Sequence, residues 1–271
     1  MTIYIPDSAF AAGEARYLAA LNGLTIANGP DGAELSLACS EPAHRLCASK
    51  RDAHDFFQAE GFPQPHDFPD GSEPYIVKPS DGSCGRGIWS TEDYCEAGGG
   101  VNAGFLVQEE LHGSVLSVAV AGHRGRVAVC PAVRLIMDDR YDRCGAEYPC
   151  TEAENAALAP LALRLGQALA LEGMLELKAV VTADGARILS LNEGLPALAA
   201  TALHFGAGLD PIGAMAALAE GRKPVFGGGR CRVRLEIDGR PGSVRGTGRL
   251  GTLAGTDGGV SDGRVRLLTD N

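Results

Sequence analysis

Basic runs, long apolar segments and paired cysteines are all missing from this sequence. The net charge is −10, and no run of Lys or Arg forms the basic surface that nucleic acid or an anionic lipid surface would need. No window reaches the roughly 18 uninterrupted apolar residues of a membrane-spanning helix, and the first residues carry no basic segment ahead of an apolar one. We therefore expect a cytoplasmic protein that binds neither nucleic acid nor membranes.

The cysteines are scattered, and no CxxC pair occurs among them. This spacing excludes a zinc knuckle and a thioredoxin-type site, so reduced thiols are expected. The eight positions are Cys39, Cys47, Cys84, Cys95, Cys130, Cys144, Cys150 and Cys231.

Lysine is also rare, which makes each lysine informative. It stands only at Lys50, Lys78, Lys178 and Lys223 in a chain of 271 residues that is 45% hydrophobic. That composition supports a sizeable core, arranged as one large or two to three small units. No GxGxxG occurs, and the 49 residues before the first lysine are few for a complete Rossmann domain.

Apolar periodicity predicts strands alternating with a few helices. A capping box, Thr151 with Glu154, opens one helix, although Pro160 inside it should produce a kink. The other expected helices are 11–21, 50–60 and 210–219, and the expected strands are 3–5, 75–77, 88–89, 104–109, 115–121, 126–130, 175–181, 187–191 and 230–238.

Lys78 ends a strand and precedes the Gly/Ser-rich segment 80–87. Backbone amides of such a loop can donate to phosphate oxygens while the ammonium neutralises their charge. The pattern indicates a phosphate-binding site formed by Lys78 and this loop. An ordinary glycine-rich hairpin turn is the alternative.

Four pieces in order resemble the ATP-grasp signature. They are Lys50 with GFPQP (61–65), YIVKPSDGSCGRGIW (75–89), LVQEELHG (106–113) and SLN (190–192). The resemblance spans residues 50–220 and implies an ATP site. In it Lys50 and Lys78 would hold phosphates, Ser83, Cys84 and Gly85 would cover them, and Gln108, Glu109, Glu110 and Leu111 would form the hinge that reads adenine.

Two subgroups of that family share further segments with this chain. DRYD (139–142), GMLELKAV (173–180), LPALAATALHFGAGLDPI (195–212) and LLTD (267–270) resemble the lysine ligases of pyrrolysine biosynthesis, which join lysine to a methylated ornithine. KPSDGSCGRG, QEELHG and GAEYP (145–149) also resemble the tyramine–glutamate ligases of methanofuran-type cofactor synthesis. Both subgroups make an amide from an amino acid carboxylate.

The resemblance implies magnesium, but the expected ligands are altered. The family places an acid on the penultimate strand and Glu-x-Asn on the last, where this chain has Lys178, Ser190 and Asn192. Strand alternation puts Glu176 on the face of Lys178, so Glu176, Asn192 and Glu193 could form a rearranged metal site. Alternatively, the Lys178 ammonium replaces part of the metal's charge, or metal binding is lost.

Other polar residues allow two interpretations. Asp139, Tyr141 and Asp142 could bind the amine and carboxylate of an amino acid substrate, or belong to a solvated loop. His204 is expected to be structural, and Cys84 would need a lowered pKa to be reactive.

These patterns predict an α+β protein with an ATP-grasp fold, in which two α/β subdomains clasp ATP. We expect a shortened N-terminal α/β portion at 1–48, an ATP-grasp domain at 49–225 with a small antiparallel subdomain about 70–110, and a C-terminal β extension at 226–271. The function expected is an ATP- and Mg²⁺-dependent carboxylate–amine ligase acting on small amino acid-like molecules, and a homodimer could complete the short N-terminal portion. A nucleotide-binding, non-catalytic subunit is the competing class.

Overall fold

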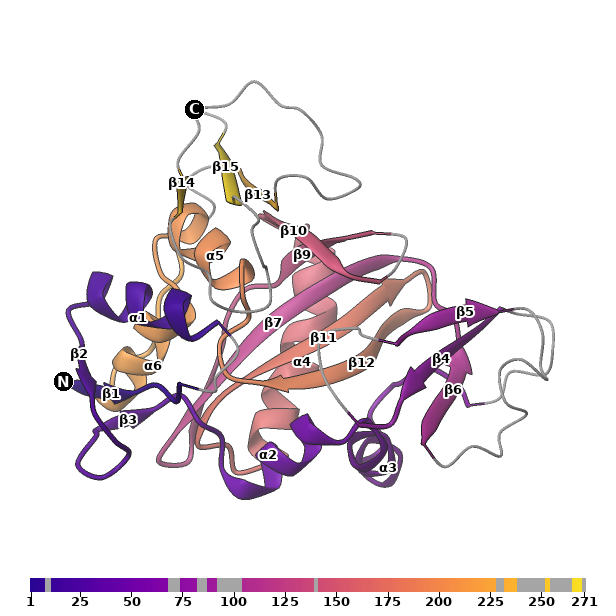
Figure 1. Cartoon of the computed structure of the whole chain (residues 1–271), viewed down its shortest axis with the longest axis horizontal. Coiled ribbons are helices and arrows are strands. Elements are labelled where there is room, and N and C mark those ends of the chain that lie inside the picture. The colour runs from indigo at the N-terminus through magenta and orange to yellow at the C-terminus, as the bar shows by residue number, and fades with distance from the viewer. Residues whose placement is uncertain are drawn as a thin grey trace.

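The computed structural model describes residues 1–7, 11–67, 74–81, 87–91, 104–138, 141–227, 232–237, 252–253 and 265–269. Within these ranges a large antiparallel sheet forms the centre of the molecule. A small sheet lies at one end and an N-terminal parallel sheet at the other (Figure 1). The mixed helix and strand content confirms the predicted α+β class.

The large sheet has nine strands in the order β12-β11-β7-β9-β10-β13-β15-β14, with β8 paired to β7. All its pairings are antiparallel. The strands are β7 (Ser114–His123), β8 (Arg126–Val129), β9 (Val133–Met137), β10 (Arg143–Tyr148), β11 (Gly173–Thr182), β12 (Gly185–Glu193), β13 (Val233–Ile237), β14 (Thr252–Leu253) and β15 (Val265–Thr269).

Alternation along β11 separates the two faces of this sheet. Leu175, Leu177 and Ala179 belong to the core beneath helix α4 (Glu152–Ala168), whereas Glu176 and Lys178 lie on the opposite face. The predicted capping box of α4 is present in full. One helix continues through Pro160.

The small sheet has the order β5-β4-β6 and is antiparallel, as the sequence predicts. Its strands are β4 (Tyr75–Pro79), β5 (Trp89–Thr91) and β6 (Phe105–Glu109). It adjoins helix α3 (Lys50–Glu60), which begins where the Ser49 hydroxyl accepts from the Asp52 amide and ends at Gly61 with φ 66°. Helix α2 (Glu41–Ala48) directly precedes α3 and was not predicted.

The N-terminal portion packs against the main body instead of standing apart. It contains a parallel sheet and helix α1 (Ala12–Leu21). In the sheet, β1 (Thr2–Tyr4) lies between β2 (Thr25–Ala27) and β3 (Leu35–Ser36). Leu18 of α1 shares one buried cluster with Met174 of β11 and Ile212 of helix α6 (Pro211–Ala219). The core therefore runs across the expected boundary at residue 48.

Helix α5 (Ala199–Ala207) precedes α6 and was also not predicted. Among the described residues, no single helix is long and apolar enough to cross a membrane. Helices α5 and α6 reach that length and composition only as a pair bent by 75°. Most residues of both helices are buried in the core.

Candidate functional site

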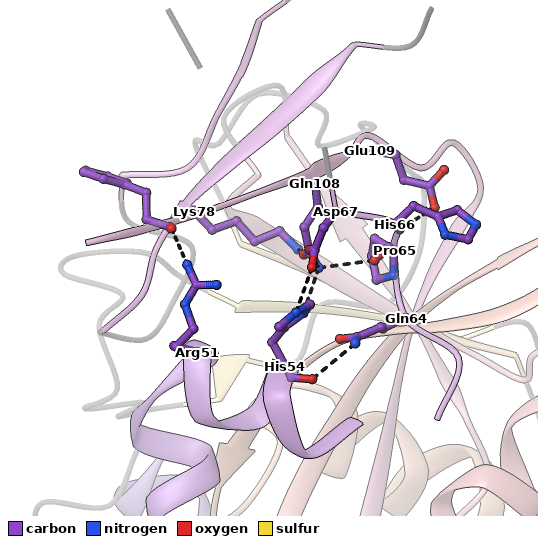
Figure 2. Close-up of polar contacts among 10 residues, drawn as sticks. Arg51, His54, Gln64, Pro65, His66, Asp67, Lys78, Gln108 and Glu109 are labelled. Carbon is purple, nitrogen blue, oxygen red and sulfur yellow. Dashed lines mark hydrogen bonds and ion pairs between the residues drawn. The ribbon is translucent and has the colours of Figure 1, made fainter. Parts of the chain in front are cut away.

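Lys78 lies on the face of the small sheet that points toward α3. It is 5% exposed, and its Nζ donates to Gln108 Oε1 at 2.9 Å (Figure 2). The two side chains share a face because Gln108 pairs with Ile76, two residues before Lys78 on β4. The other face carries the small apolar cluster of Tyr75, Val77 and Val107.

Gln108 is also the centre of a polar network with α3. Its Nε2 lies 3.3 Å from Pro65 O, 3.4 Å from Asp67 Oδ1 and 3.5 Å from His54 Nδ1. His54 Nε2 lies 2.8 Å from Asp67 Oδ2 (Figure 2). Sequence analysis missed His54 and Asp67. The sequence could have indicated His54, because it follows Lys50 by one helical turn and so lies on the same face of the helix.

Lys50 and Lys78 are held at the same end of β4. The Lys50 amide donates to Ser80 O at 2.7 Å, and Arg51 fixes α3 to the sheet by donating to Phe105 O at 2.7 Å. Burial, together with the nearby charge of Lys50, lowers the pKa of Lys78 to about 8, while Asp67 opposes that shift. The two lysines therefore form a compact cationic position that favours an anionic ligand.

The expected hinge begins within β6, at Gln108 and Glu109, and continues beyond the strand through Glu110 and Leu111. Glu109 exchanges hydrogen bonds with the backbone of His66, and the Glu110 amide donates to Pro74 O at 2.9 Å. Leu111 comes next and is half-buried. The hinge is thus fixed to the segment that leads from α3 into the small sheet.

Tyr141, which follows β9 in the chain, contacts the expected hinge. Its hydroxyl donates to Glu110 Oε1 at 2.5 Å, and Ser90 of β5 donates to the other oxygen of the same carboxylate. Burial and this contact raise the pKa of Tyr141 to about 12. Asp142, in contrast, closes a local turn with Asp138, to whose Oδ1 its amide donates at 2.9 Å.

Several predicted site residues lie outside the described residues. They are Ser83, Cys84 and Gly85 of the expected phosphate loop and Asp139 of the expected substrate segment. His204, which was expected to be structural, contacts the buried carboxylate of Asp210 at 2.9 Å.

The three expected metal ligands do not come together. Glu176 and Asn192 meet, with Asn192 Nδ2 donating to Glu176 Oε2 at 2.9 Å. Glu193 lies on the other face of β12, where its carboxylate accepts from the Cys39 amide at 2.8 Å and contacts His44 Nδ1 at 2.7 Å. Side chains alternate along β12, so residues 192 and 193 point to opposite faces of the sheet. The sequence pattern could therefore have excluded Glu193 from a shared metal site.

The remaining Glu176 carboxylate does not suit magnesium. Its Oε1 accepts from Ser117 Oγ at 2.6 Å and from Arg143 at 2.8 Å, and its Oε2 lies 3.9 Å from Lys178 Nζ. Burial acts to raise the pKa of Glu176, but Arg143, Lys178 and the hydrogen bonds hold it below its ordinary value. Within the described ranges, no three His, Cys, Asp or Glu side chains are placed to share a metal ion.

Two cavities lie near these elements. One, of about 10 Å³, is lined by Lys50, His54 and Gln108 together with Ser190 of β12, and so lies between α3, the small sheet and the edge of the large sheet. The other, of about 380 Å³, has an apolar lining that includes Val118 and Phe226 and no charged residue. The first cavity is too small for a phosphate, but of these two cavities it is the one that a lysine lines, so we place the candidate site beside it.

A small antiparallel sheet that carries Lys78, helix α3 that begins at Lys50 and a large antiparallel sheet agree with the expected ATP-grasp fold. Residues 47–195, more than half of the chain, match the ATP-grasp domain family. The chain belongs to that family.

Among curated proteins, the chain is similar to 3-methyl-D-ornithine–L-lysine ligases. That of Methanosarcina acetivorans is 28% identical over 170 residues, which are 63% of this chain and 46% of the relative. That of Methanosarcina barkeri is 27% identical over 172 residues, with the same coverage. The chain thus spans about half the length of the curated relatives it matches.

Solved structures agree on the fold. Phosphoribosylamine–glycine ligase from Thermotoga maritima has a TM-score of 0.67 at 16% identity, covering 100% of this chain and 90% of that one. An ATP-grasp superfamily protein from Archaeoglobus fulgidus has a TM-score of 0.62 at 17% identity, covering 87% and 68%. Carboxyaminoimidazole ribonucleotide synthase from Aspergillus clavatus, complexed with ATP, has a TM-score of 0.60 at 13% identity, covering 83% and 62%.

Proposed function

We propose that this chain is an ATP-dependent carboxylate–amine ligase that joins two small amino acid-like molecules. The observation that carries the proposal is the pair Lys50 and Lys78, held at one end of β4 beside the hinge. Curated relatives named as ligases support the same reaction class.

The chemistry requires two steps. A substrate carboxylate oxygen attacks the γ-phosphorus of ATP, and ADP leaves. An amine nitrogen then attacks the acyl carbon, inorganic phosphate leaves, and the nitrogen loses a proton. Positioning and charge neutralisation supply most of the catalysis in such transfers.

The residues predicted to bind nucleotide and substrates have the following roles in this proposal. Lys50 and Lys78 hold the phosphates, together with the segment containing Ser83, Cys84 and Gly85. The backbone of Glu109, Glu110 and Leu111 reads adenine. Tyr141, already in contact with the hinge, and the segment Asp139–Asp142 face the amino acid substrates.

The substrates we propose are lysine and a methylated ornithine, because the curated relatives are named for that pair. A tyramine–glutamate ligase activity is the alternative within the same reaction class. We propose that the enzyme is cytoplasmic, and we predict that two copies of the chain form a homodimer.

The test is ADP release from ATP in the presence of Mg²⁺ and pairs of amino acids. We expect release to need both a carboxylate donor and an amine donor, and to disappear in Lys78→Met. Lys223→Met, which changes an exposed lysine, is the matched control. Release that ignores the donors would contradict the ligase proposal.

A nucleotide-binding subunit without catalysis is the second candidate. The Glu176 carboxylate, which accepts three hydrogen bonds within the protein, favours it, because a ligase of this class is expected to use such an acid for metal. Nucleotide binding in calorimetry, without ADP release for any pair of donors, is the result that would select it.

A further inference from the structure

Glu176 is the centre of a buried cluster on the face of the large sheet opposite α4, where α5 and α6 also pack. Its side chain is 2% exposed, and four neighbours surround the carboxylate: Ser117, Arg143, Lys178 and Asn192. They come from β7, β10, β11 and β12, so four strands converge on one acid.

The two carboxylate oxygens have little capacity left for a metal ion. Oε1 accepts two hydrogen bonds, at 2.6 and 2.8 Å, and Oε2 accepts one at 2.9 Å with an ammonium 3.9 Å away. A divalent cation at either oxygen would also meet the Arg143 and Lys178 charges at close range. Metal binding here would require breaking the cluster.

The net charge of the cluster has the opposite sign to that of a metal-binding site. One carboxylate and two cations give a net charge of +1, so the cluster attracts anions. Arg143 donates to Ala197 O through its other terminal nitrogen, which fixes the guanidinium. The Lys178 and Arg143 side chains keep 18% and 12% exposure.

The cluster adjoins the candidate nucleotide site. Lys178 pairs directly with Ser190 across β11 and β12, and Ser190 lines the same small cavity as Lys50 and Gln108. Asn192 lies two residues further along β12, on the face of Ser190. Phosphates held by Lys50 and Lys78 would thus extend toward Lys178.

We propose that Lys178 and Arg143 take the place of the divalent metal at the nucleotide phosphates, so that this chain binds ADP without Mg²⁺. The inference rests on the proposed nucleotide site but not on catalysis. The ligand class is a nucleoside polyphosphate whose charge is neutralised by side-chain cations.

Calorimetric titration with ADP tests this in EDTA and in excess Mg²⁺. For the unaltered chain, we expect the two Kd values to agree within about threefold, a difference of under 1 kcal/mol. Lys178→Met is expected to weaken binding in EDTA about tenfold or more, since it removes a charge-assisted contact. Lys178→Arg should retain most of the affinity, and Lys223→Met should match the unaltered chain.

Three results would overturn the inference. They are a loss of ADP affinity in EDTA larger than about threefold, unchanged affinity in Lys178→Met, and the absence of ADP binding in both buffers. The comparison of buffers uses the unaltered chain, so it holds even if a variant unfolds. Metal-independent binding without ADP release would refute the ligase proposal alone, whereas turnover with metal-dependent binding would refute this inference alone.

Discussion

Lys78 illustrates what a buried cation at a ligand site implies. Its ammonium is removed from water and lies near Lys50, with Gln108 Oε1 as a neutral hydrogen-bond acceptor. A negative ligand would add the charge that this position lacks. Protonation of Lys78 should therefore be linked to nucleotide binding.

We expect ADP affinity to fall as the pH rises above about 8, the pKa of Lys78 in the folded chain. Below that pH the ammonium is charged and binds phosphate, and above it the free site loses its proton. The protonated fraction falls from about one half at pH 8 to about one eleventh at pH 9, so the loss over that interval should approach about fivefold. Calorimetry at both values measures it, and Lys78→Arg, which stays charged, should show a flatter profile.

Glu176 shows the opposite case, a buried anion between two cations. Glu176→Gln would leave Arg143 and Lys178 without their counter-charge and should lower the free energy of unfolding by about 3–5 kcal/mol. Urea denaturation measures this. Asp55→Asn on the exposed surface of α3 is the control and should change stability by less than about 0.5 kcal/mol. A similarly small change for Glu176→Gln would contradict the cluster.

Among the elements, α4 is the one that the sequence specifies most fully. Thr151 and Glu154 satisfy the first turn, and Leu158 and Leu165 face the sheet. Glu154 also pairs with Arg134 of β9 at 2.8 Å. Pro160 is the exception, because it lacks the amide hydrogen that would bond to Ala156 O.

Pro160→Ala should stabilise the chain by about 1–3 kcal/mol, because it restores that hydrogen bond and removes the steric clash with the preceding turn. Thermal unfolding gives the change. The matched control is Pro30→Ala in an exposed loop, where the same substitution frees the unfolded chain and should lower stability slightly. A loss of stability in Pro160→Ala would contradict this expectation and mean that the proline ring supports packing.

Helix α5 was not predicted because its first residues lack a local cap. Leu198 stands at the N-cap position with φ 63°. The cap comes from Glu14 of α1, whose carboxylate accepts from the Leu198 and Thr201 amides at 3.1 Å each and from the Thr201 hydroxyl. Since 184 residues separate Glu14 from Leu198, no local pattern could indicate it.

At the scale of the whole molecule, this cap and the shared apolar cluster join the N-terminal portion to the main body. Leu18 and Ile3 bury their side chains with Met174 and Met215, which lie far from them in the sequence. The C-terminal strand β13 likewise extends the large sheet beyond β10. We therefore expect the described portion to unfold as one cooperative unit.

Glu14→Gln tests the connection between these parts and should lower stability by about 1–3 kcal/mol, because a buried donor loses its acceptor. Burial raises the pKa of Glu14 above 4.5, despite its hydrogen bonds. The folded chain therefore holds the proton more tightly, and the stability that Glu14 contributes is largest below pH 4.5 and declines as the pH rises through the folded pKa. Urea denaturation at pH 5 and pH 8 should show the smaller gap between wild type and Glu14→Gln at pH 8.

The sequence alone determined the local structure and the family. Caps and turns marked α3, α4 and the β11–β12 hairpin, and the ordered pieces around Lys50, Lys78 and Gln108 identified the ATP-grasp fold. These signals are local because propensity, capping and alternation act over a few residues. Only the tertiary structure brought Arg143 and Ser117 to Glu176, His54 to Asp67 and Glu14 to α5, since strand order and register decide which distant side chains meet.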